Sequence, residues 1–537
     1  MSGIYDRPSP SRVSQDLQGR SRARLAGMSD DAVQAYLADA VYLERKRFHA
    51  QRHSDPASAE EVEAIEAAAR ATHQGRHEQE RAILALVDTY AHEIHNVFSQ
   101  RAYKVATRVI PSALSRLLTS TSPRGLVRRG AFDPDQRLII ETAAGDDGAA
   151  LRALARDHTL IFAPTHVSNL DSPLIGYALD RLGLPPAIYG AGLNLFGNPV
   201  MGFFMSRLGA YTVDRRKQHR LYKDVLKDYS VDSLGRRCHS LFFPGGTRCR
   251  SGRVEDRVKK GLLGTGIIAW QEGLERGRPQ PEVLVVPLTL SFSLVLEAET
   301  LIEDSLEEEG KRRYIITDDE FSEPRRVASF ARQVLELDDA IVLRFGVPLD
   351  LLGNPVDLQG RSLGKDGAVL DRRAYVTDAD GQVVRDEQRD HVYTDILSQR
   401  LVEAWHRDST VLATHVASFA AGRLLRRAHP RLPTAQLVLL PPAERPVSRP
   451  DLLQAITTLL GELDDMVAAG RIRTRLPGAG AEPAARASAV LDEALSRFKG
   501  FHSRRTLEDR GGSIGLDPRL LLYYSHRLHG YGLPGEM

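Results

Sequence analysis

Residues 159–173 are Thr-Leu-Ile-Phe-Ala-Pro-Thr-His-Val-Ser-Asn-Leu-Asp-Ser-Pro, and they predict a strand, a sharp turn and a helix in succession. The apolar first half, which ends at Pro164, is typical of a short buried strand. His166 and Asp171 follow it with four residues between them. On one continuous helix, residues at this separation point about 140° away from each other, so their side chains could not meet. They can meet if the chain turns after the strand and begins a helix near Asp171.

The residues around this pair favour such a corner. Ser168 and Asn169 are common in turns and helix caps, and Pro173 suits the first turn of a helix. An imidazole held by a carboxylate at a strand-to-helix corner can take a proton from a hydroxyl group. Because histidine and aspartate also meet by chance in many loops, the pair predicts a catalytic site only together with other motifs.

Composition limits the possible classes of protein. A chain of 537 residues exceeds a single core, and about two to four domains are expected. The formal net charge is only +2, so a basic surface would require local clustering. Two cysteines, Cys238 and Cys249, are too few for a disulfide framework and fit a reducing cytosol. The polar N-terminus predicts no secretory signal, and no apolar run approaches the ~18 residues of a spanning helix.

Changes of hydrophobic period divide the chain into four predicted parts. Residues 1–24 are expected to be disordered, 25–132 to form a helical domain, 133–371 an α/β domain and 372–537 a helical C-terminal domain. Helical stretches alternate in the α/β part with short apolar runs at 137–140, 159–163, 209–213, 240–243, 283–290 and 340–346. No strands are expected beyond about Arg372, where helical runs cover 384–428, 449–471 and 484–499.

A basic segment, residues 101–129, lies within a stretch that has no Asp or Glu from Ile94 to Phe132. Apolar residues recur at helical spacing beside its arginines, so one side of the helix would be apolar and the other basic. Such a helix can lie on an anionic membrane surface. It can equally pack its apolar side on the next domain and leave the basic side in water, which is the simpler alternative.

Two further blocks are rich in glycine and arginine. Residues 191–216 combine small residues, which let a ligand approach the backbone, with Arg215 at a strand end, where it can pair with a phosphate. In Leu-Phe-Phe-Pro-Gly-Gly-Thr-Arg-Cys-Arg-Ser-Gly-Arg, residues 241–253, a strand leads into a glycine turn with Arg248 and Arg250 after it. Backbone N–H groups around Gly246 and Thr247, together with the two guanidinium groups, suit a phosphoryl group. Each block alone could also be an ordinary exposed loop.

Other kinds of site lack support in the sequence. No Cys/His cluster has metal-ligand spacing, no Gly-x-Ser-x-Gly elbow occurs, and basic residues are not interleaved with aromatics as in nucleic-acid-binding proteins. We therefore expect no metal, no cofactor and no nucleic-acid partner. The other histidines without a partner at suggestive spacing are expected to be structural: His219, His239, His406 and His415.

In this order and spacing, the blocks resemble the glycerol-3-phosphate acyltransferases of the glycerolipid acyltransferase superfamily. The resemblance covers roughly residues 155–350 and rests on His166–Asp171, the 191–215 stretch, Phe243–Gly252 and Val286–Glu297. Residues 522–529, Leu-Tyr-Tyr-Ser-His-Arg-Leu-His, resemble a segment that the longer enzymes of this family also carry. The resemblance implies a mixed sheet covered by helices, flanked here by the helical N- and C-terminal domains.

The resemblance also implies roles for residues. His166 would be the general base and Asp171 its orienting partner, while Arg215, Arg248 and Arg250 would hold the acceptor's phosphate. Backbone N–H groups at the helix start after His166 are expected to bind the oxyanion. The acyl donor would be acyl-CoA or acyl-carrier protein and the acceptor glycerol 3-phosphate, with no metal. Such an enzyme of phospholipid synthesis would lie on the cytoplasmic face of the membrane as a peripheral protein, or in the cytoplasm.

One residue departs from the family pattern. The family usually has a glutamate before the Gly-Thr-Arg of the third block, and this chain has Gly245; the soluble plastid branch also lacks that glutamate. The departure leaves three alternatives open. They are the same chemistry on dihydroxyacetone phosphate, the same chemistry on lysophosphatidate, and a non-catalytic relative that binds lipid surfaces.

Overall fold

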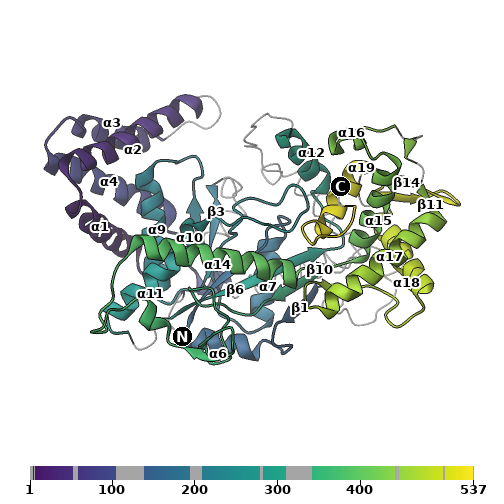
Figure 1. Ribbon diagram of the computed structural model, residues 1–537. Helices are drawn as coiled ribbons and strands as arrows, with labels where there is room; N and C mark the ends of the chain where they lie inside the picture. Colours follow the sequence, from purple (N-terminus) through teal and green to yellow (C-terminus); the bar gives the residue numbers. More distant parts are fainter. Residues whose placement is uncertain are drawn as a thin grey trace.

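The computed structural model describes residues 4, 7–51, 58–103, 138–193, 209–278, 282–309, 341–441, 444–445, 447–499, 502 and 504–535. A seven-stranded sheet lies between two helical regions, drawn purple and yellow-green in Figure 1. In order across the sheet, its strands are β1 (Leu138–Thr142), β7 (Ile341–Phe345), β6 (Val283–Phe292), β2 (Thr159–Pro164), β5 (Ser240–Leu241), β3 (Ile188–Gly192) and β4 (Ala210–Val213).

Five neighbouring strands of this sheet run parallel: β6, β2, β5, β3 and β4. Their carboxyl ends therefore share one edge, which we call the carboxyl edge. β7 runs antiparallel to β6, and β1 is parallel to β7, so the sheet is mixed. The predicted fold class, an α/β domain with a mixed sheet and helical regions on both sides, is confirmed.

The two faces of the sheet belong to different hydrophobic cores. Leu160 and Phe162 of β2 lie in one cluster, whereas Ile161 and Ala163 lie in the other. Successive side chains of a strand point to opposite faces, so a strand covered on both faces must be apolar throughout. This requirement explains the continuous apolar run that the sequence shows before Pro164.

Helices connect the strands and cover the sheet. They are α6 (Ala149–Asp157), α7 (Asp171–Arg181), α9 (Arg220–Gly235), α10 (Lys260–Leu263), α11 (Thr265–Glu275) and α12 (Ala298–Glu309). Strand β3 is the one strand of the sheet that the apolar runs did not predict. Its glycines are more typical of a loop, and a Cβ at Gly190 would come within 3.1 Å of the ring of Tyr211 on β4, which is a tight contact.

The N-terminal region is a bundle of four described helices, α1 (Pro10–Ala26), α2 (Asp30–Gln51), α3 (Ala59–Ala71) and α4 (Arg76–Ile94). It shares a hydrophobic core with α9 and with the β3 and β4 end of the sheet. Ser58 caps α3 with a capping box that includes Glu61, and Gly75 precedes α4. The basic segment at 101–129 lies almost wholly outside the described residues.

The prediction of disorder for residues 1–24 is wrong over residues 10–24, which belong to α1. Ser9 caps this helix, and Val13, Leu17 and Leu25 are buried on one of its faces. Arg20 and Arg24 pair with Glu272 at 2.6 Å and Asp228 at 2.7 Å on α11 and α9. The polar composition that suggested disorder is therefore used in ion pairs to the α/β domain.

The C-terminal region is mainly helical, with α14 (Glu387–Asp408), α15 (Ala413–Ala428), α16 (Thr434–Leu437), α17 (Arg449–Ala468), α18 (Pro483–Phe498) and α19 (Pro518–Ser525). Short 3-10 helices cover Arg372–Tyr375 and His526–Leu528. Trp405 of α14 donates from Nε1 to the carbonyl oxygen of Ala163 at 3.0 Å, which ties this region to the end of β2. No helix among the described ranges is long and apolar enough to span a membrane.

Short strands beyond Arg372 correct the prediction that strands end there. The described chain has a hairpin, β8 (Ser362–Leu363) with β9 (Val369–Leu370), and after it β10 (Thr410–Val411), β11 (Val447–Ser448), β12 (Arg473–Thr474), β13 (Leu507–Asp509) and β14 (Ser513–Leu516). Strand β10 divides the helical run predicted at 384–428 into α14 and α15. Strands of so few residues show no alternating pattern, so periodicity cannot detect them.

Candidate active site

The described parts of the four predicted blocks lie along the carboxyl edge, and residues 194–208 of the second block lie outside the described residues. His166 follows β2, the glycine and arginine loop follows β5, Arg215 follows β4, and Glu297 follows β6. Because these strands are parallel, the residues after them lie on the same side of the sheet. Residues spread over more than 130 positions of the sequence are thus brought to one edge, as ligands are in open α/β sheets.

His166 and Asp171 form the predicted pair. The chain turns after Pro164, and α7 begins at Asp171 itself. Nδ1 of His166 lies 2.8 Å from Oδ2 of Asp171. The same oxygen accepts hydrogen bonds from the backbone N–H groups of Val167 at 2.6 Å and Ser168 at 3.0 Å. Asp171 is fully buried, whereas the imidazole keeps 16% of its surface exposed, so the carboxylate fixes a ring that remains accessible.

The backbone N–H groups of the turn between His166 and α7 are not available for the oxyanion, which corrects the expectation for these residues. Those of Val167 and Ser168 bind Asp171, that of Asn169 binds Glu297 at 2.9 Å, and that of Leu170 binds the hydroxyl of Ser168 at 3.2 Å. The buried carboxylates of Asp171 and Glu297 accept the N–H groups of Val167, Ser168 and Asn169. The N–H groups of residues 167–170 are therefore already bonded within the protein.

Glu297 is the second carboxylate beneath this turn. It accepts from the Ser168 hydroxyl at 3.0 Å, and Arg248 lies 3.5 Å from it across the edge. Burial raises the pKa of Glu297, although the N–H of Asn169 and the charge of Arg248 act in the opposite direction. Glu297 therefore connects the histidine turn to Arg248, the first arginine of the glycine loop. From the sequence, Glu297 was known only as the residue that ends the fourth block.

The loop after β5 lies against His166. The ring of Phe243 stacks on the imidazole with 4.0 Å between centroids, and the N–H of Cys249 donates to the carbonyl oxygen of His166 at 2.7 Å. Gly246 has a φ of 83°, which favours glycine, and Thr247 next to it is exposed. The side chain of Lys259 lies over Gly246, so a Cβ at Gly246 would overlap the end of that side chain.

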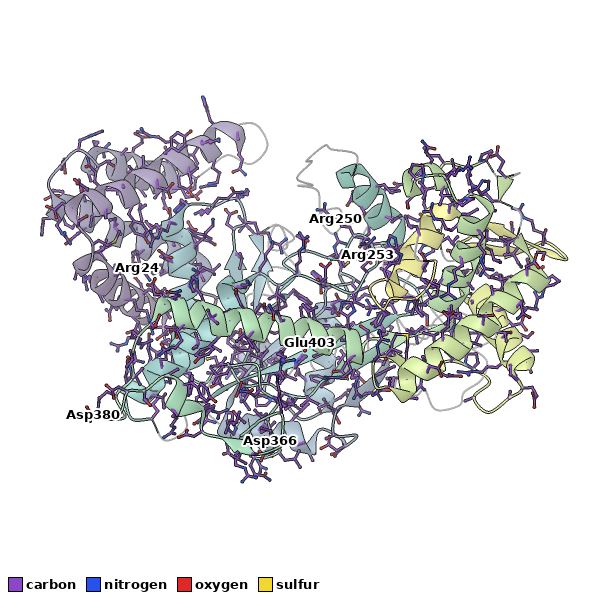
Figure 2. The ribbon with its side chains drawn as sticks, viewed as in Figure 1. Arg24, Arg250, Arg253, Asp366, Asp380 and Glu403 are labelled. Atoms are coloured by element: carbon purple, nitrogen blue, oxygen red, sulfur yellow. The ribbon has the colours of Figure 1, made fainter. Side chains whose placement is uncertain are left out.

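The end of this loop contacts the C-terminal segment that resembles the longer enzymes. Nδ1 of His526 lies 2.7 Å from the carbonyl oxygen of Ser251, and a Cβ at Gly252 would overlap the carbonyl oxygen of Tyr523. Figure 2 labels Arg250 and Arg253 of this loop near α12. The predicted substrate-binding residues Gly246, Thr247, Arg248 and Arg250 therefore lie in one loop that is held from two sides.

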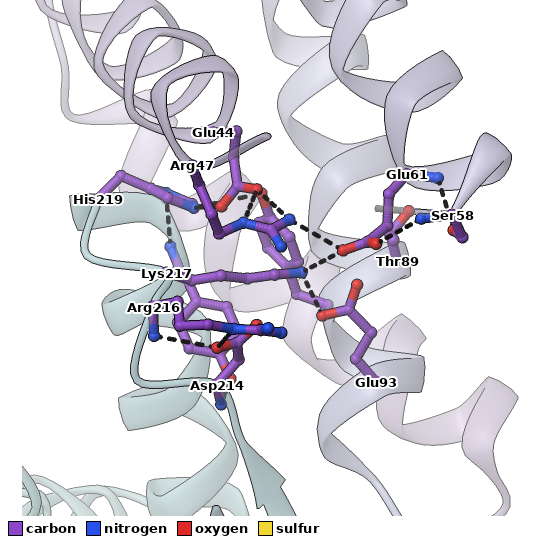
Figure 3. Close-up of polar contacts among 12 residues, drawn as sticks. Glu44, Arg47, Ser58, Glu61, Thr89, Glu93, Asp214, Arg216, Lys217 and His219 are labelled. Carbon is purple, nitrogen blue, oxygen red and sulfur yellow. Dashed lines mark hydrogen bonds and ion pairs between the residues drawn. The ribbon is translucent and has the colours of Figure 1, made fainter. Parts of the chain in front are cut away.

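Arg215 is farther from the histidine than the other arginines. It is exposed and follows β4, which is three strands away from β2, or roughly 14 Å at the usual strand spacing. The neighbouring residues are held by the N-terminal bundle: Lys217 pairs with Glu93 at 2.6 Å and Glu61 at 3.2 Å (Figure 3). The structure places Arg215 at the correct edge but does not bring it next to His166.

Glu255 is a site residue that the sequence did not predict. Its Oε2 accepts the backbone N–H of His166 at 3.1 Å, while its Oε1 is buried and has no hydrogen-bond partner among the described residues. Burial, together with the charge of Asp171, raises the pKa of Glu255 to about 8. The sequence contains one indirect sign of Glu255: Gly245 stands where the resembling family usually has a glutamate. Within the described ranges, no group of three or more His, Cys, Asp and Glu side chains could hold a metal ion.

Residues 150–291 match the profile of the acyltransferase family. This stretch contains β2, the histidine turn, the arginine loop and nearly all of β6. Over these residues the chain is similar to the acyltransferase family, in agreement with the resemblance drawn from the sequence blocks.

The curated relatives that match include proteins named glycerol-3-phosphate acyltransferase. Those of Glaesserella parasuis and Haemophilus ducreyi are each 34% identical over 152 residues, and that of Actinobacillus pleuropneumoniae is 32% identical over 156 residues. The matches cover 28% of this chain for the first two and 29% for the third, and 18% of each relative. The chain therefore matches less than one fifth of the length of these curated relatives.

Proposed function

We propose that this protein transfers a fatty-acyl group from an acyl thioester to the 1-hydroxyl of glycerol 3-phosphate, which is the first step of phospholipid synthesis. The observation that carries this proposal is the hydrogen bond between the partly exposed His166 and the buried Asp171, at an edge that also carries Arg248 and Arg250. The relatives named glycerol-3-phosphate acyltransferase support the choice of acceptor.

His166 is the general base of the proposed reaction. Asp171 accepts a hydrogen bond from Nδ1–H of His166. Nε2 therefore presents its lone pair to the hydroxyl of the acceptor. As that hydroxyl oxygen attacks the thioester carbonyl, Nε2 takes its proton, and the Asp171 charge stabilises the imidazolium. The carbon–sulfur bond then breaks, the imidazolium returns the proton to the thiolate, and 1-acylglycerol 3-phosphate and free thiol result.

The arginines bind the phosphate of the acceptor in this proposal. Arg248 is pre-positioned by Glu297, and Arg250 follows it in the same loop, next to the backbone of Gly246 and Thr247. Arg215 approaches from the other end of the carboxyl edge and suits the outer side of the phosphate. The oxyanion needs donors from outside the histidine turn, since the N–H groups of that turn are already bonded.

The donor is proposed to be acyl-CoA or acyl-carrier protein, and no cofactor takes part. The product is a lipid, so we propose that the protein works as a peripheral protein on the cytoplasmic face of the membrane. Flotation of the purified protein with vesicles that contain anionic lipid tests this placement. Protein that stays at the bottom of the gradient at low salt would contradict it.

The activity itself is tested with purified protein, lipid vesicles and palmitoyl-CoA or palmitoyl-acyl-carrier protein. Glycerol 3-phosphate, dihydroxyacetone phosphate and lysophosphatidate are compared as acceptors, with a reaction without acceptor as the blank. The expected result is fastest lipid formation with glycerol 3-phosphate. Faster turnover of either other acceptor would change the substrate, and no product with any pair would support the non-catalytic alternative that Gly245 suggested.

A further inference from the structure

The glycine turn after β5 leaves space that a side chain from later in the loop fills. A Cβ at Gly245 would overlap Oε1 of Glu255 and lie 2.8 Å from its Cδ, which real Cβ atoms do not approach. Gly245 has no unusual backbone conformation that would require glycine. The absence of a side chain at this position is therefore explained by the carboxyl group of Glu255.

Glu255 also connects this turn to the histidine. Its Oε2 accepts the N–H of His166 at 3.1 Å, and on the other side the N–H of Cys249 donates to the His166 carbonyl at 2.7 Å. Both main-chain polar groups of His166 are thus held by the loop that follows β5. Because the imidazole projects from this main chain, a shift of the backbone moves the ring against its substrate.

The electrostatic environment of Glu255 allows it to hold the main chain of His166 close to Asp171. Burial raises its pKa to about 8 and the charge of Asp171 adds to the effect, whereas the His166 N–H and Arg527 oppose it. At neutral pH the carboxyl group is consequently uncharged and can sit near Asp171 without repelling it. Oε1 then has a hydrogen-bonding capacity that no described residue uses.

We propose that Gly245 and Glu255 act as one unit, in which the carboxyl group of Glu255 occupies the side-chain space of position 245 and positions His166 through its main-chain N–H. In this chain the carboxyl group comes from a residue later in the same loop, where the resembling family has a glutamate before Gly-Thr-Arg. Glu255 is a positioning residue, and Gly245 is the residue that makes room for it. This inference rests on the proposed function.

The first test compares kcat and KM of four single variants. Glu255→Ala should lower kcat about 10- to 100-fold with little change in the KM for glycerol 3-phosphate, because it moves the base rather than the phosphate ligands. Glu255→Gln keeps the acceptor oxygen and should retain kcat within about threefold. Gly245→Ala should lower kcat by up to the same factor as Glu255→Ala. Asp256→Ala, an exposed neighbour, is the control and should behave as wild type.

The second test asks whether the two positions are coupled. If they share one space, Gly245→Ala combined with Glu255→Ala should be no slower than Glu255→Ala alone, because the side chain that the Cβ displaces is already absent. Gly245→Glu combined with Glu255→Ala moves the carboxyl group back and should recover most of the lost kcat. Losses that multiply in the first pair, or a second pair no faster than Glu255→Ala, would overturn the proposal.

Unfolding measurements separate this inference from the proposed function. Gly245→Ala should lower the urea midpoint in the wild-type background and leave it unchanged in the Glu255→Ala background. If wild-type protein transfers no acyl group to any acceptor, the proposed function fails while this coupling still tests the shared space. If transfer occurs but the midpoints show no coupling, the inference fails and the proposed function stands.

Discussion

Among the described residues, two histidine–carboxylate pairs have the ring nitrogen within 3.0 Å of the carboxylate oxygen, and they differ in what surrounds them. His166 and Asp171 are 2.8 Å apart at the carboxyl edge. His219 and Glu44 are 3.0 Å apart where the N-terminal bundle meets the α/β domain (Figure 3). The first imidazole is partly exposed, whereas the second is completely buried. Distance alone therefore does not distinguish a candidate catalytic pair from a structural one.

The ring nitrogens separate the two pairs. In His219, Nδ1 accepts the N–H of Tyr222 at 3.2 Å, and Nε2 lies near both Glu44 and the Tyr90 hydroxyl. Neither nitrogen can reach a substrate. In His166, Asp171 binds Nδ1, and the ring stacks on Phe243 with part of its surface exposed. The second pair thus has the closed surroundings of a structural pair, as the sequence predicted for His219, and the first has the arrangement that the proposed proton transfer requires.

The clusters around the two histidines also differ in their buried polar atoms without a hydrogen-bond partner. At the edge, Oδ1 of Asp171 and Oε1 of Glu255 are buried without a hydrogen-bond partner among the described residues. The cluster around His219, which we call the clamp, has no such side-chain atom among its members: Glu44, Arg47, Glu61, Glu93, Lys217 and His219. Such atoms also occur away from the edge, for example at Ser418 and Arg423, so they add to the distinction only together with the exposed imidazole.

The charge of Asp171 should be essential for rate, whereas that of Glu44 should not. Asp171→Asn can keep the hydrogen bonds to the turn but removes the charge that stabilises the imidazolium, so kcat should fall by roughly 10²-fold or more while the protein stays folded. Glu44→Gln, its counterpart in the clamp, should lower stability and leave kcat per folded molecule unchanged. Acyl-transfer rates and circular dichroism of both variants check this. Equal losses of kcat would erase the distinction between the two pairs.

Lys217→Met tests the clamp itself. Lys217 is 2% exposed and lies between Glu93 and Glu61, so its loss removes the cation that pairs with Glu93 and leaves Glu61 with Arg47. We expect a decrease of about 3–5 kcal/mol in the free energy of unfolding, measured by urea denaturation. Adding Glu93→Gln should restore part of it, because burial already raises the pKa of Glu93 and its charged form is costly. An unchanged midpoint would show that the clamp does not stabilise the fold.

Arg248→Ala should act on the acceptor. We expect the KM for glycerol 3-phosphate to rise about 10-fold, with a smaller change in kcat, because a phosphate ligand is lost while the base remains. Arg24→Ala is a matched control, since Arg24 is also paired with a carboxylate and similarly exposed but lies on α1. If both variants raise the KM equally, Arg248 has no specific part in phosphate binding.

Glu255 should make stability depend on pH in a direction opposite to that of an ordinary carboxylate. Its pKa of about 8 in the folded protein exceeds the usual 4.5, so its contribution is fully present below pH 4.5 and is lost as the pH rises through 8. The groups that act on it are Asp171, Arg527, Cys249 and the His166 N–H. The melting temperature of wild type should therefore fall more between pH 5 and about 8.5 than that of Glu255→Gln. Parallel curves would contradict this.

Short-range patterns in the sequence predicted the central elements well. The apolar run before Pro164 and the turn residues after it placed His166 against Asp171, because strand burial and helix capping are local properties. Strand β3 was missed because its glycines are typical of a loop, and the short C-terminal strands because so few residues show no alternating pattern. The helix α1 was missed because partners distant in sequence stabilise it. The ion pairs of Arg20 and Arg24 with α11 and α9 are an example.

The site was predicted in its residue types but not in its connections. Spacing could not reveal that Asp171 and Glu297 occupy the N–H groups of the histidine turn, since Glu297 is more than 120 residues away. Nor could it reveal that Glu255 fills the space at Gly245. The departure from the family pattern was visible, but its physical reason required the path of the loop after β5.

Acceptor-dependent thiol release from palmitoyl-CoA tests the central claim most directly. The rate is measured with and without glycerol 3-phosphate for wild type, for His166→Ala and for His219→Gln, with each rate divided by the folded fraction. We expect release by wild type and His219→Gln that requires the acceptor, and almost none by His166→Ala. Acceptor-dependent release by His166→Ala within a few-fold of wild type would contradict the claim that this histidine is the base.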